Sequence, residues 1–482
     1  MSAAAALAVA IYQRPAFIDG IYIIAFGLLI YGMSGLTGPR TAVRGNKIAA
    51  LGMAIAIAIT LLRRGEFHGA DTWWLIALGL VIGTAIGIPA ALKVRMTAMP
   101  QMVALFNGVG GGAVWLIAWV EYRHHFAPGY FPLRKEVFEL FGAIVGSISF
   151  WGSNIAFGKL QELLPGRPIK LPGASQTALN ALLLLVAVGT MVALLAGVHS
   201  QLLFVLGILL AAALLGNMVV LPIGGADMPV VIALLNAFTG LSAAATGVAL
   251  GNTAMIVAGM IVGASGTILT NLMARAMNRS VPAIIAGGFG GAVAAPGAAQ
   301  AASEGKVVRS TSAQDVAIQL AYARQVVIAP GYGMAVAQAQ HAVRELERAL
   351  EAKGVEVKFA IHPVAGRMPG HMNVLLAEAD VPYELLKEMD EINPEFPRTD
   401  VTLVIGANDV VNPAANNEPG SPIYGMPILE VDKSGAVVVL KRSMASGFAG
   451  VDNPLFYNPK TSLLFGDAKQ SVSEITAELQ AL

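Results

Sequence analysis

The segment Gln325-Val326-Val327-Ile328-Ala329-Pro330-Gly331-Tyr332-Gly333-Met334-Ala335-Val336 joins an apolar run to a glycine-x-glycine turn. The apolar run from Gln325 to Ala329 predicts a buried strand, and the amphipathic pattern from Ala335 to Lys353 predicts a helix. Gly354 ends this helix, and a second strand is expected from Val355 to Ile361. A strand, a glycine turn, a helix and a second strand in this order predict a dinucleotide-binding unit.

The two glycines have a physical role in such a unit. Gly331 would make the tight turn, and Gly333 would let the backbone approach a pyrophosphate at the helix N-terminus. Val336 takes the place of the third glycine of the usual pattern. A purely structural turn is the alternative, because this glycine spacing also occurs by chance.

The rest of residues 312–482 continues the alternation of strands and helices. Further strands are expected at Val401 to Ile405, Ile428 to Val431, Ala436 to Leu440 and Ser462 to Phe465, and further helices at Ala313 to Ala323 and Ala468 to Leu479. This alternation predicts a Rossmann-like, doubly wound α/β domain with a mainly parallel sheet. Its ligand would bind beyond the carboxyl ends of the strands.

The strand ends indicate which coenzyme the domain prefers. Ile361-His362-Pro363 offers no carboxylate to accept a hydrogen bond from an unphosphorylated ribose, which disfavours NAD. Lys441-Arg442-Ser443 follows a predicted strand and could hold a 2′-phosphate by charge-assisted hydrogen bonds. These residues favour NADP(H), and the alternative is a solvated basic pair.

Residues 1–286 predict a polytopic α-helical membrane bundle. The whole chain of 482 residues is 56% hydrophobic and only 13% charged, with a mean hydropathy of +0.66, which is too apolar for a water-soluble globule. The absence of cysteine excludes thiolate catalysis and Fe–S clusters. Nine spans are expected, at Ala16 to Ser34, Ile48 to Leu62, Trp73 to Ala91, Met99 to Val120, Val137 to Phe157, Ala178 to Val198, Leu202 to Leu221, Met228 to Leu250 and Ala254 to Met273.

Charge orients this bundle in the membrane. With the N-terminus outside, ten basic residues lie in the inner loops and six in the outer loops, as the positive-inside rule favours. Nine spans then deliver the C-terminal domain to the cytoplasm of a cell's inner (plasma) membrane, through a linker at residues 287–311. Residues 302–482 carry 22 acidic against 15 basic residues, which argues against nucleic-acid binding. The ten inner residues are Arg40, Arg44, Lys47, Lys93, Arg95, Lys159, Arg167, Lys170, Arg275 and Arg279.

The interior of the spans is polar but uncharged. No ionisable residue is expected deep inside them, whereas hydroxyl and amide residues recur. Asn107, Ser153 and Asn236 could line a hydrated proton pathway, and the alternative is ordinary bonding between helices. Asp227, before the eighth span, could cap that helix or face the soluble domain. Glycines four residues apart, such as Gly79, Gly83 and Gly87, are expected to let helices pack closely.

Several longer stretches carry a family resemblance. They are Gly224-Gly225-Ala226-Asp227-Met228-Pro229, Pro330 to Gln340, His362-Pro363-Val364-Ala365-Gly366-Arg367-Met368-Pro369-Gly370-His371, Gly406-Ala407-Asn408-Asp409, Lys441-Arg442-Ser443-Met444 and Gly466-Asp467-Ala468-Lys469. With these motifs the chain resembles, essentially from end to end, the beta subunit family of proton-translocating nicotinamide nucleotide transhydrogenases. The resemblance implies a domain that binds NADP(H) and accepts hydride, with Si–Re specificity, from NADH on alpha subunits. It also implies inward proton movement and a two-fold assembly in the lipid bilayer.

The resemblance also implies roles for particular residues. No acid or base catalyst and no metal is required, because hydride passes directly between nicotinamide rings. Asp409 is the candidate for a protonation-sensitive switch, and the alternative is an ordinary solvated carboxylate. Asn107 stands where some relatives have a histidine, so a titrating relay cannot be transferred to this position. The expected cofactor-binding residues are Gly331, Tyr332, Gly333, Met334, Ala335 and Val336 in the turn; Val364, Ala365, Gly366, Arg367, Met368 and Pro369 near the pyrophosphate; Gly406, Ala407, Asn408, Asp409, Val410, Gly425 and Met426 near the nicotinamide; Lys441, Arg442 and Ser443 at the 2′-phosphate; Gly447 and Phe448 in a lid; and Asp467 and Ala468.

A different class of function is compatible with the same pattern. A transporter or channel could carry a cytoplasmic dinucleotide domain that only senses redox state. The missing acidic residue after the second strand and the Lys-Arg-Ser motif argue against an NAD sensor of this kind.

Overall fold

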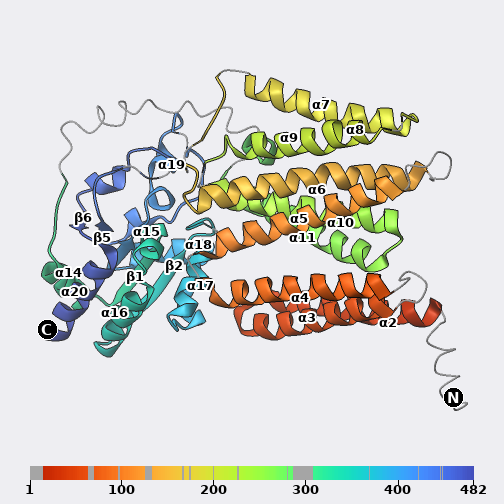
Figure 1. Ribbon diagram of the computed structural model, residues 1–482. Helices are drawn as coiled ribbons and strands as arrows, with labels where there is room; N and C mark the ends of the chain where they lie inside the picture. The colour runs from red at the N-terminus through yellow and green to blue at the C-terminus, as the bar shows by residue number, and fades with distance from the viewer. Residues whose placement is uncertain are drawn as a thin grey trace, which may run out of the picture.

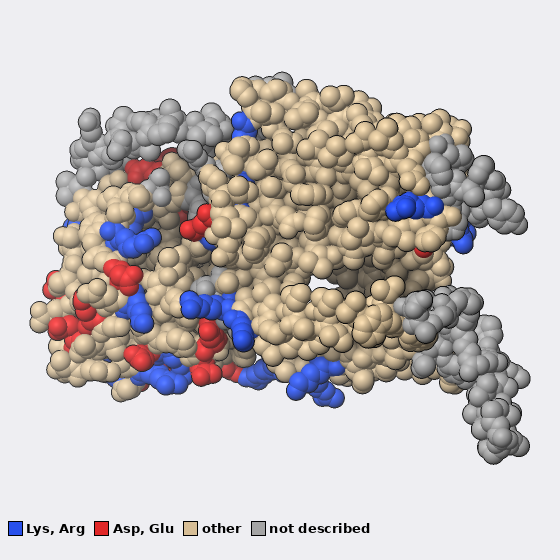
Figure 2. Space-filling model, in the orientation of Figure 1, with Lys and Arg blue, Asp and Glu red and all other residues tan. Residues whose placement is uncertain are grey.

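The molecule consists of a helical bundle and an α/β domain, which lie side by side in Figure 1. The computed structural model describes residues 15–482 except 63–69, 96–97, 125–132, 166–167, 173–174, 199, 225–226, 279, 286–307, 368–369, 422, 446 and 448. Most of the expected linker therefore lies outside the described residues. Figure 2 shows that charged side chains gather on the α/β domain, whereas the visible flank of the bundle is almost free of them.

Within the described residues, nine helical segments are long and apolar enough to cross a membrane, which confirms the predicted number of spans. The second helix begins nine residues earlier than expected, because Arg40, Arg44 and Lys47 extend it instead of forming a loop. The seventh span includes a π-helical segment, Phe204–Leu210. The helices of the bundle are α2 (Pro15–Ser34), α3 (Pro39–Leu62), α4 (Ala70–Lys93), α5 (Met99–His124), α6 (Leu133–Leu160), α7 (Ser175–Leu195), α8 (Gln201–Leu203), α9 (Ala211–Val220), α10 (Met228–Leu250), α11 (Thr253–Ala276) and α12 (Val281–Ile285).

Helices α5, α6, α10 and α11 pack closely through small residues. A Cβ atom at Gly111 would lie 3.0 Å from the Gly146 carbonyl oxygen, and one at Gly240 would lie 2.9 Å from that of Gly259. The glycines therefore let the backbones approach, as expected in lipid. For the glycines of α4 the prediction remains untested, because an added Cβ there would meet no described atom within 4 Å.

The C-terminal domain is a six-stranded parallel sheet in the order β3-β2-β1-β4-β5-β6, which confirms the Rossmann-like fold. Apolar side chains on the two faces form two separate cores. Helices α14 (Ala313–Ala321), α16 (Gln340–Ala352), α17 (His371–Glu378) and α20 (Ala468–Ala481) contribute to the first core, and short helical turns such as η6 (Asn393–Arg398) contribute to the second. The strands are β1 (Gln325–Pro330), β2 (Glu356–Ile361), β3 (Leu386–Glu388), β4 (Val401–Ile405), β5 (Ala436–Lys441) and β6 (Thr461–Phe465).

Two local predictions in this domain are wrong. The helix expected from Ala335 to Lys353 is interrupted at Gln338, whose φ is +51°, so that a short α15 (Tyr332–Val336) precedes α16. Residues 428–431 form no strand: Leu429 donates to the Val410 carbonyl outside any ladder, although its side chain is buried in the second core. The sixth strand of the sheet is β3 instead, which was not predicted. It has only three residues, a pattern too short to be recognised in the sequence.

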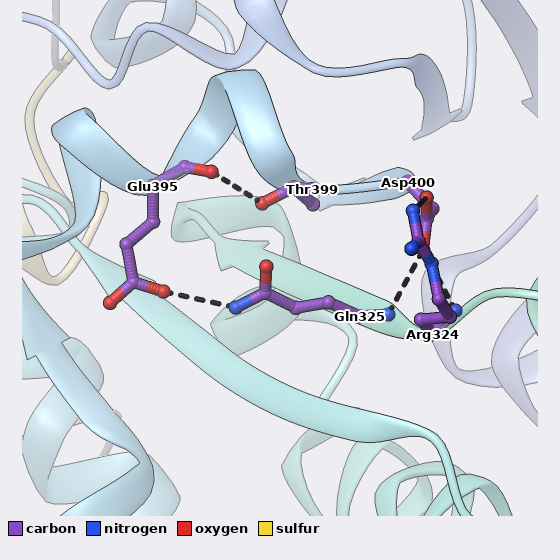
Figure 3. Close-up of polar contacts among 5 residues, drawn as sticks. All are labelled: Arg324, Gln325, Glu395, Thr399 and Asp400. Carbon is purple, nitrogen blue, oxygen red and sulfur yellow. Dashed lines mark hydrogen bonds and ion pairs between the residues drawn. The ribbon is translucent and has the colours of Figure 1, made fainter.

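Polar contacts fix the amino ends of β1 and β4, as Figure 3 shows. Asp400 Oδ2 accepts hydrogen bonds from the backbone N–H groups of Arg324, at 2.8 Å, and Gln325, at 3.2 Å. The Gln325 side chain donates to Glu395. Glu395 also binds Lys358, at 2.6 Å. Because these contacts and both cores lie within residues 308–482, we expect this domain to fold independently.

Candidate functional site

The glycine turn after β1 packs against the turn after β4, at the point where the strand order reverses. Gly331 N–H donates to the Ile405 carbonyl and Gly333 N–H to the Gly406 carbonyl, both at 2.9 Å. Gly406 has a φ of +66°, and a Cβ at Gly333 would lie 2.7 Å from the Gly406 Cα. The glycines are thus needed to join the two turns. Helix α15 has only five residues, so the long helix that was expected to begin at this turn does not start here, and its dipole is correspondingly small.

Two buried histidines hold the loop that follows β2. His362 Nδ1 accepts a hydrogen bond from Val364 N–H at 3.2 Å, so Nε2 carries the proton and donates to the Pro427 carbonyl at 2.8 Å. His371 Nδ1 accepts from Arg367 N–H at 2.9 Å. Burial lowers the pKa of each histidine to about 4, and Arg367 contributes to the lowering at His371. Both rings are therefore neutral supports of this loop, a role that the sequence motif did not reveal.

Arg367 connects this loop to the glycine turn and to the bundle. Its guanidinium carbon lies 4.5 Å from the centre of the Tyr332 ring, so the two segments meet. Its Nη1 also donates to the Leu160 carbonyl at the end of α6, at 3.1 Å, and its Nη2 lies 3.4 Å from Glu162. Burial raises the pKa of the Tyr332 hydroxyl, and the positive charge of Arg367 opposes this shift. Met368 and Pro369 lie outside the described residues.

The expected lid lies against the turn after β4. Asp409 Oδ2 accepts a hydrogen bond from Ala449 N–H at 3.0 Å, and a Cβ at Gly447 would lie 2.9 Å from the Asn408 side-chain nitrogen. Asn453, which sequence reasoning missed, donates to the Asn408 backbone and side-chain oxygens at 3.1 and 3.0 Å. Phe448 lies outside the described residues. Gly447 and Ala449 thus lie against Asn408 and Asp409.

The basic motif at the end of β5, Lys441 to Ser443, is partly buried and partly exposed. Lys441 is half-buried, with its Nζ 4.4 Å from the centre of the Phe456 ring. Burial lowers the pKa of Lys441, while the charges of Asp409 and Asp452 act in the opposite direction. Arg442 and Ser443 are exposed beside it. The motif therefore offers three donors at the carboxyl edge of the sheet.

Other expected site residues have structural contacts of their own. Asp467 caps α20, because its Oδ1 accepts from the backbone N–H groups of the two residues after Ala468 at 3.0 and 3.2 Å. An Asp before an amphipathic pattern is a helix-start signal that the sequence already contained. Gly425, with a φ of +77°, lies against Asn278 at the end of α11. Met426 is buried in a small cluster near Ala414.

The structure brings together part of the predicted proton pathway. Asn107 Nδ2 donates to Ser153 Oγ at 2.9 Å and lies 3.3 Å from Ser149 Oγ. Ser149 in turn bonds to Thr239 of α10 at 2.6 Å. Asn236 is half-buried and lies outside this hydrogen-bonded group. Asp227 precedes α10, but its side chain does not cap the helix.

Two ionisable side chains near the ends of α6 are buried, although no ionisable residue was expected deep inside a span. Lys159, which was assigned to an inner loop, is the penultimate residue of α6 and is buried. Its ammonium group donates to the carbonyls of Leu221 and Ile223, the latter at 2.7 Å. These carbonyls follow the end of α9, where a cation is favourable. Glu139, near the other end of α6, is also buried.

The fold and the site define a class: membrane-embedded proteins that carry a Rossmann-like nucleotide-binding domain. Residues 18–478 match the family model described as NAD(P) transhydrogenase beta subunit. Two relatives named NAD(P) transhydrogenase subunit beta, from Rhodospirillum rubrum and from a defined strain of that species, are each 50% identical over 461 residues, covering 94% of this chain and 97% of theirs. The chain therefore belongs to the NAD(P) transhydrogenase beta subunit family. Membership implies binding of a nicotinamide dinucleotide and a partner alpha subunit.

Proposed function

We propose that this chain binds NADP(H) on its C-terminal domain and accepts hydride, with Si–Re specificity, from NADH held by alpha subunits in a two-fold assembly. The transfer is coupled to inward proton movement across a cell's inner membrane. The choice of NADP(H) over NAD(H) rests on the residues that stand at the carboxyl ends of β2 and β5. β2 is followed by His362, whose ring is occupied by backbone contacts, whereas β5 ends at Lys441 with Arg442 and Ser443 exposed beside it.

The donors at this edge suit a phosphate monoester. An ammonium, a guanidinium and a hydroxyl group can each donate to phosphate oxygens, and charge-assisted bonds of this kind are strong. Lys441, Arg442 and Ser443 would hold the 2′-phosphate, and the turn from Gly331 to Val336 would face the pyrophosphate. When bound, NADP(H) supplies the nicotinamide that carries hydride. The chain's own contribution is to orient this ring and to exclude water, which the closed contact between Asp409 and Ala449 supports.

Contacts between the domain and the bundle provide a physical basis for coupling. Arg367 binds the end of α6, Asn278 donates to the Tyr424 carbonyl at 3.0 Å, and Arg40 pairs with Glu384. All three partners in the bundle belong to loops or helix ends expected on the inner side, which supports a cytoplasmic domain. Proton binding can shift nucleotide affinity only through contacts that differ between two states. We assign this role to the Arg367 contact and to Asp409.

The proton route proposed here runs through the group of Asn107, Ser149, Ser153 and Thr239, with Asp227 and Asn236 near its inner part. Hydroxyl and amide groups can relay a proton only with water or a neighbouring titratable group, because they do not titrate themselves. Moving one charge through 100 mV is worth about 2.3 kcal/mol, enough to bias hydride transfer. Membership in the family leaves no support for a channel with a purely sensory domain.

The coenzyme choice can be tested on residues 308–482. NADPH and NADH affinities are measured by calorimetry for the wild type, for Lys441→Met, and for Lys353→Met as a control, since Lys353 is exposed at the end of α16. Lys441→Met should weaken NADPH about tenfold or more, because a hydrogen bond to a charged group is worth about 1.5–3 kcal/mol. NADH affinity should not change. Equal loss for both coenzymes, or a wild type that prefers NADH, would contradict the proposal.

Coupling is tested on the complete enzyme. The chain is reconstituted with alpha subunits in vesicles, and hydride transfer from NADH to NADP⁺ is recorded together with the internal pH. The two signals should rise together and should both depend on the membrane potential. Hydride transfer without any pH change would show a transhydrogenase that does not move protons.

A further inference from the structure

The bundle contains a buried carboxyl group that the proton pathway above does not use. Glu139 of α6 is 2% exposed, and its Oε1 accepts no hydrogen bond from the described residues. Among the residues that the structure describes, the charged or titratable groups that act on Glu139 are Glu121 and Tyr122 of α5 and Glu136 of its own helix. None of them is a cation. Phe204, which stacks on Tyr122 at 4.3 Å, and Thr246 of α10 are also uncharged.

Such surroundings favour the protonated form of a carboxyl group. An ionised carboxylate that is buried without a cation or hydrogen-bond donors loses several kcal/mol of hydration free energy. Two acidic neighbours add repulsion to this cost. The side chain is therefore a group that takes up a proton when it enters this environment and releases one when the environment changes.

Glu139 also begins a continuous stripe of small and polar residues along α6. Residues 139, 142, 146, 149 and 153 follow each other at intervals of three and four, so they share one face of the helix. This face meets α5 and α10. From Glu139 to Ser153 the stripe spans about 21 Å, at about 1.5 Å per residue.

Polar groups of α10 fill the gap between Glu139 and the Asn107 group. Gly142, one turn from Glu139, packs against the hydroxyl of Thr246, which is 1% exposed and has no hydrogen-bond partner among the described residues. Ser242 and Thr239 follow on α10 at the same three- and four-residue intervals. Thr239 then bonds to Ser149 at 2.6 Å. The stripe thus leads from a carboxyl group at the outer end to the amide of Asn107.

We propose that Glu139 is the outer proton-binding group of the translocation pathway. A proton from the outer solution binds its carboxylate, and the resulting acid donates that proton inward, by way of water beside Thr246, to the group around Ser149. The carboxylate is restored for the next cycle, so proton and charge balance. The inference rests on the proposed proton translocation, and it gives the pathway the titratable group that Asn107 cannot supply.

The test replaces Glu139 in the complete enzyme reconstituted with alpha subunits. Glu139→Gln keeps the shape but cannot titrate, and should lower the rate of proton uptake by about a hundredfold, the usual contribution of a positioned proton-transfer group. Asp19→Asn, which removes an exposed acid near the outer end of α2, is the control and should pump normally. NADPH affinity, measured on the same samples, should not change. Wild-type pumping by Glu139→Gln would overturn the inference, whereas a wild type that moves no protons would contradict the proposed function instead.

Two further measurements separate titration from structure. Glu139→Asp keeps a carboxyl group and should pump at a measurable rate with a shifted pH profile; complete loss in this variant, with intact assembly, would indicate a packing role and overturn the inference. Infrared difference spectra recorded during turnover should show the C=O stretch of a protonated carboxyl group in the wild type. This band should disappear in Glu139→Gln, and its persistence would show that another acid carries the proton.

Discussion

Acidification should weaken the C-terminal domain through His362 and His371, and the size of the effect can be worked out from their environment. Burial lowers each pKa from an ordinary 6.5 to about 4. Between these values the unfolded chain binds more protons than the folded one, so stability rises with pH. The contribution is fully present above pH 6.5 and is lost as the pH falls towards 4. Between pH 7 and pH 5 each histidine should lower the free energy of unfolding by about 2 kcal/mol.

The substitution that isolates this effect is His371→Phe. It removes the titrating ring and should therefore roughly halve the loss of stability between pH 7 and pH 5. It should also lower the free energy of unfolding by about 1–3 kcal/mol at pH 7, because the partly buried Arg367 N–H loses its acceptor. Since this loop carries Arg367 beside Tyr332, NADPH affinity should fall as well. His341→Phe is the control, because His341 is exposed on α16.

Urea unfolding of residues 308–482 at pH 7, 6 and 5 gives the free energy of unfolding at each pH, provided that the m-value stays constant. The wild type and His341→Phe should lose stability in parallel, and His371→Phe should lose less. The reasoning is refuted if the wild type is equally stable at pH 7 and pH 5. It is also refuted if His371→Phe loses as much stability as the wild type, since the ring would then not be the group that titrates.

Three further predictions concern other parts of the molecule. Gly406→Ala should lower the free energy of unfolding of the C-terminal domain, measured with urea, by at least about 2 kcal/mol, because its new Cβ would collide with Gly333 at a residue with left-handed φ. Gly354→Ala, also at a left-handed φ but in open space, should lower it by about half as much. Equal losses would refute the packing argument. Asp400→Ala should lower the melting temperature at neutral pH, since hydrogen bonds from the Arg324 backbone, supported by other contacts, hold the pKa of Asp400 below its ordinary value. The stability that the Asp400 carboxylate contributes is lost as the pH falls through that lowered pKa, so the melting temperatures of the variant and the wild type should converge in acid. The same difference in melting temperature at every pH would contradict this prediction. Asn107→Leu should abolish proton uptake by the complete enzyme while NADPH binding persists, and unchanged pumping would remove this residue from the pathway.

Local patterns predicted the elements of this fold, whereas contacts between distant segments could not be read from the sequence. Apolar length alone identified the nine spans, and the apolar runs of β1, β2, β4, β5 and β6 are strong enough to be recognised one at a time. The run at residues 428–431 is equally apolar, but its side chains fill the second core without joining the sheet. The burial of Glu139 and Lys159 depends on α5 and on the end of α9, so their positions near the ends of a span gave no sign of it.

The glycine turn shows how a correct fold prediction can rest on an incomplete physical reason. The sequence assigned Gly331 and Gly333 to the cofactor, whereas the structure shows that both must first admit the backbone around Gly406. Such glycines would be required in this fold whether or not a nucleotide bound. Loss of NADPH binding in a glycine variant would therefore not distinguish the loss of a cofactor contact from the loss of packing between the two turns. Lys441 provides the sharper test of what the domain binds, because its side chain lies on the edge of the sheet and outside the contact between the two turns.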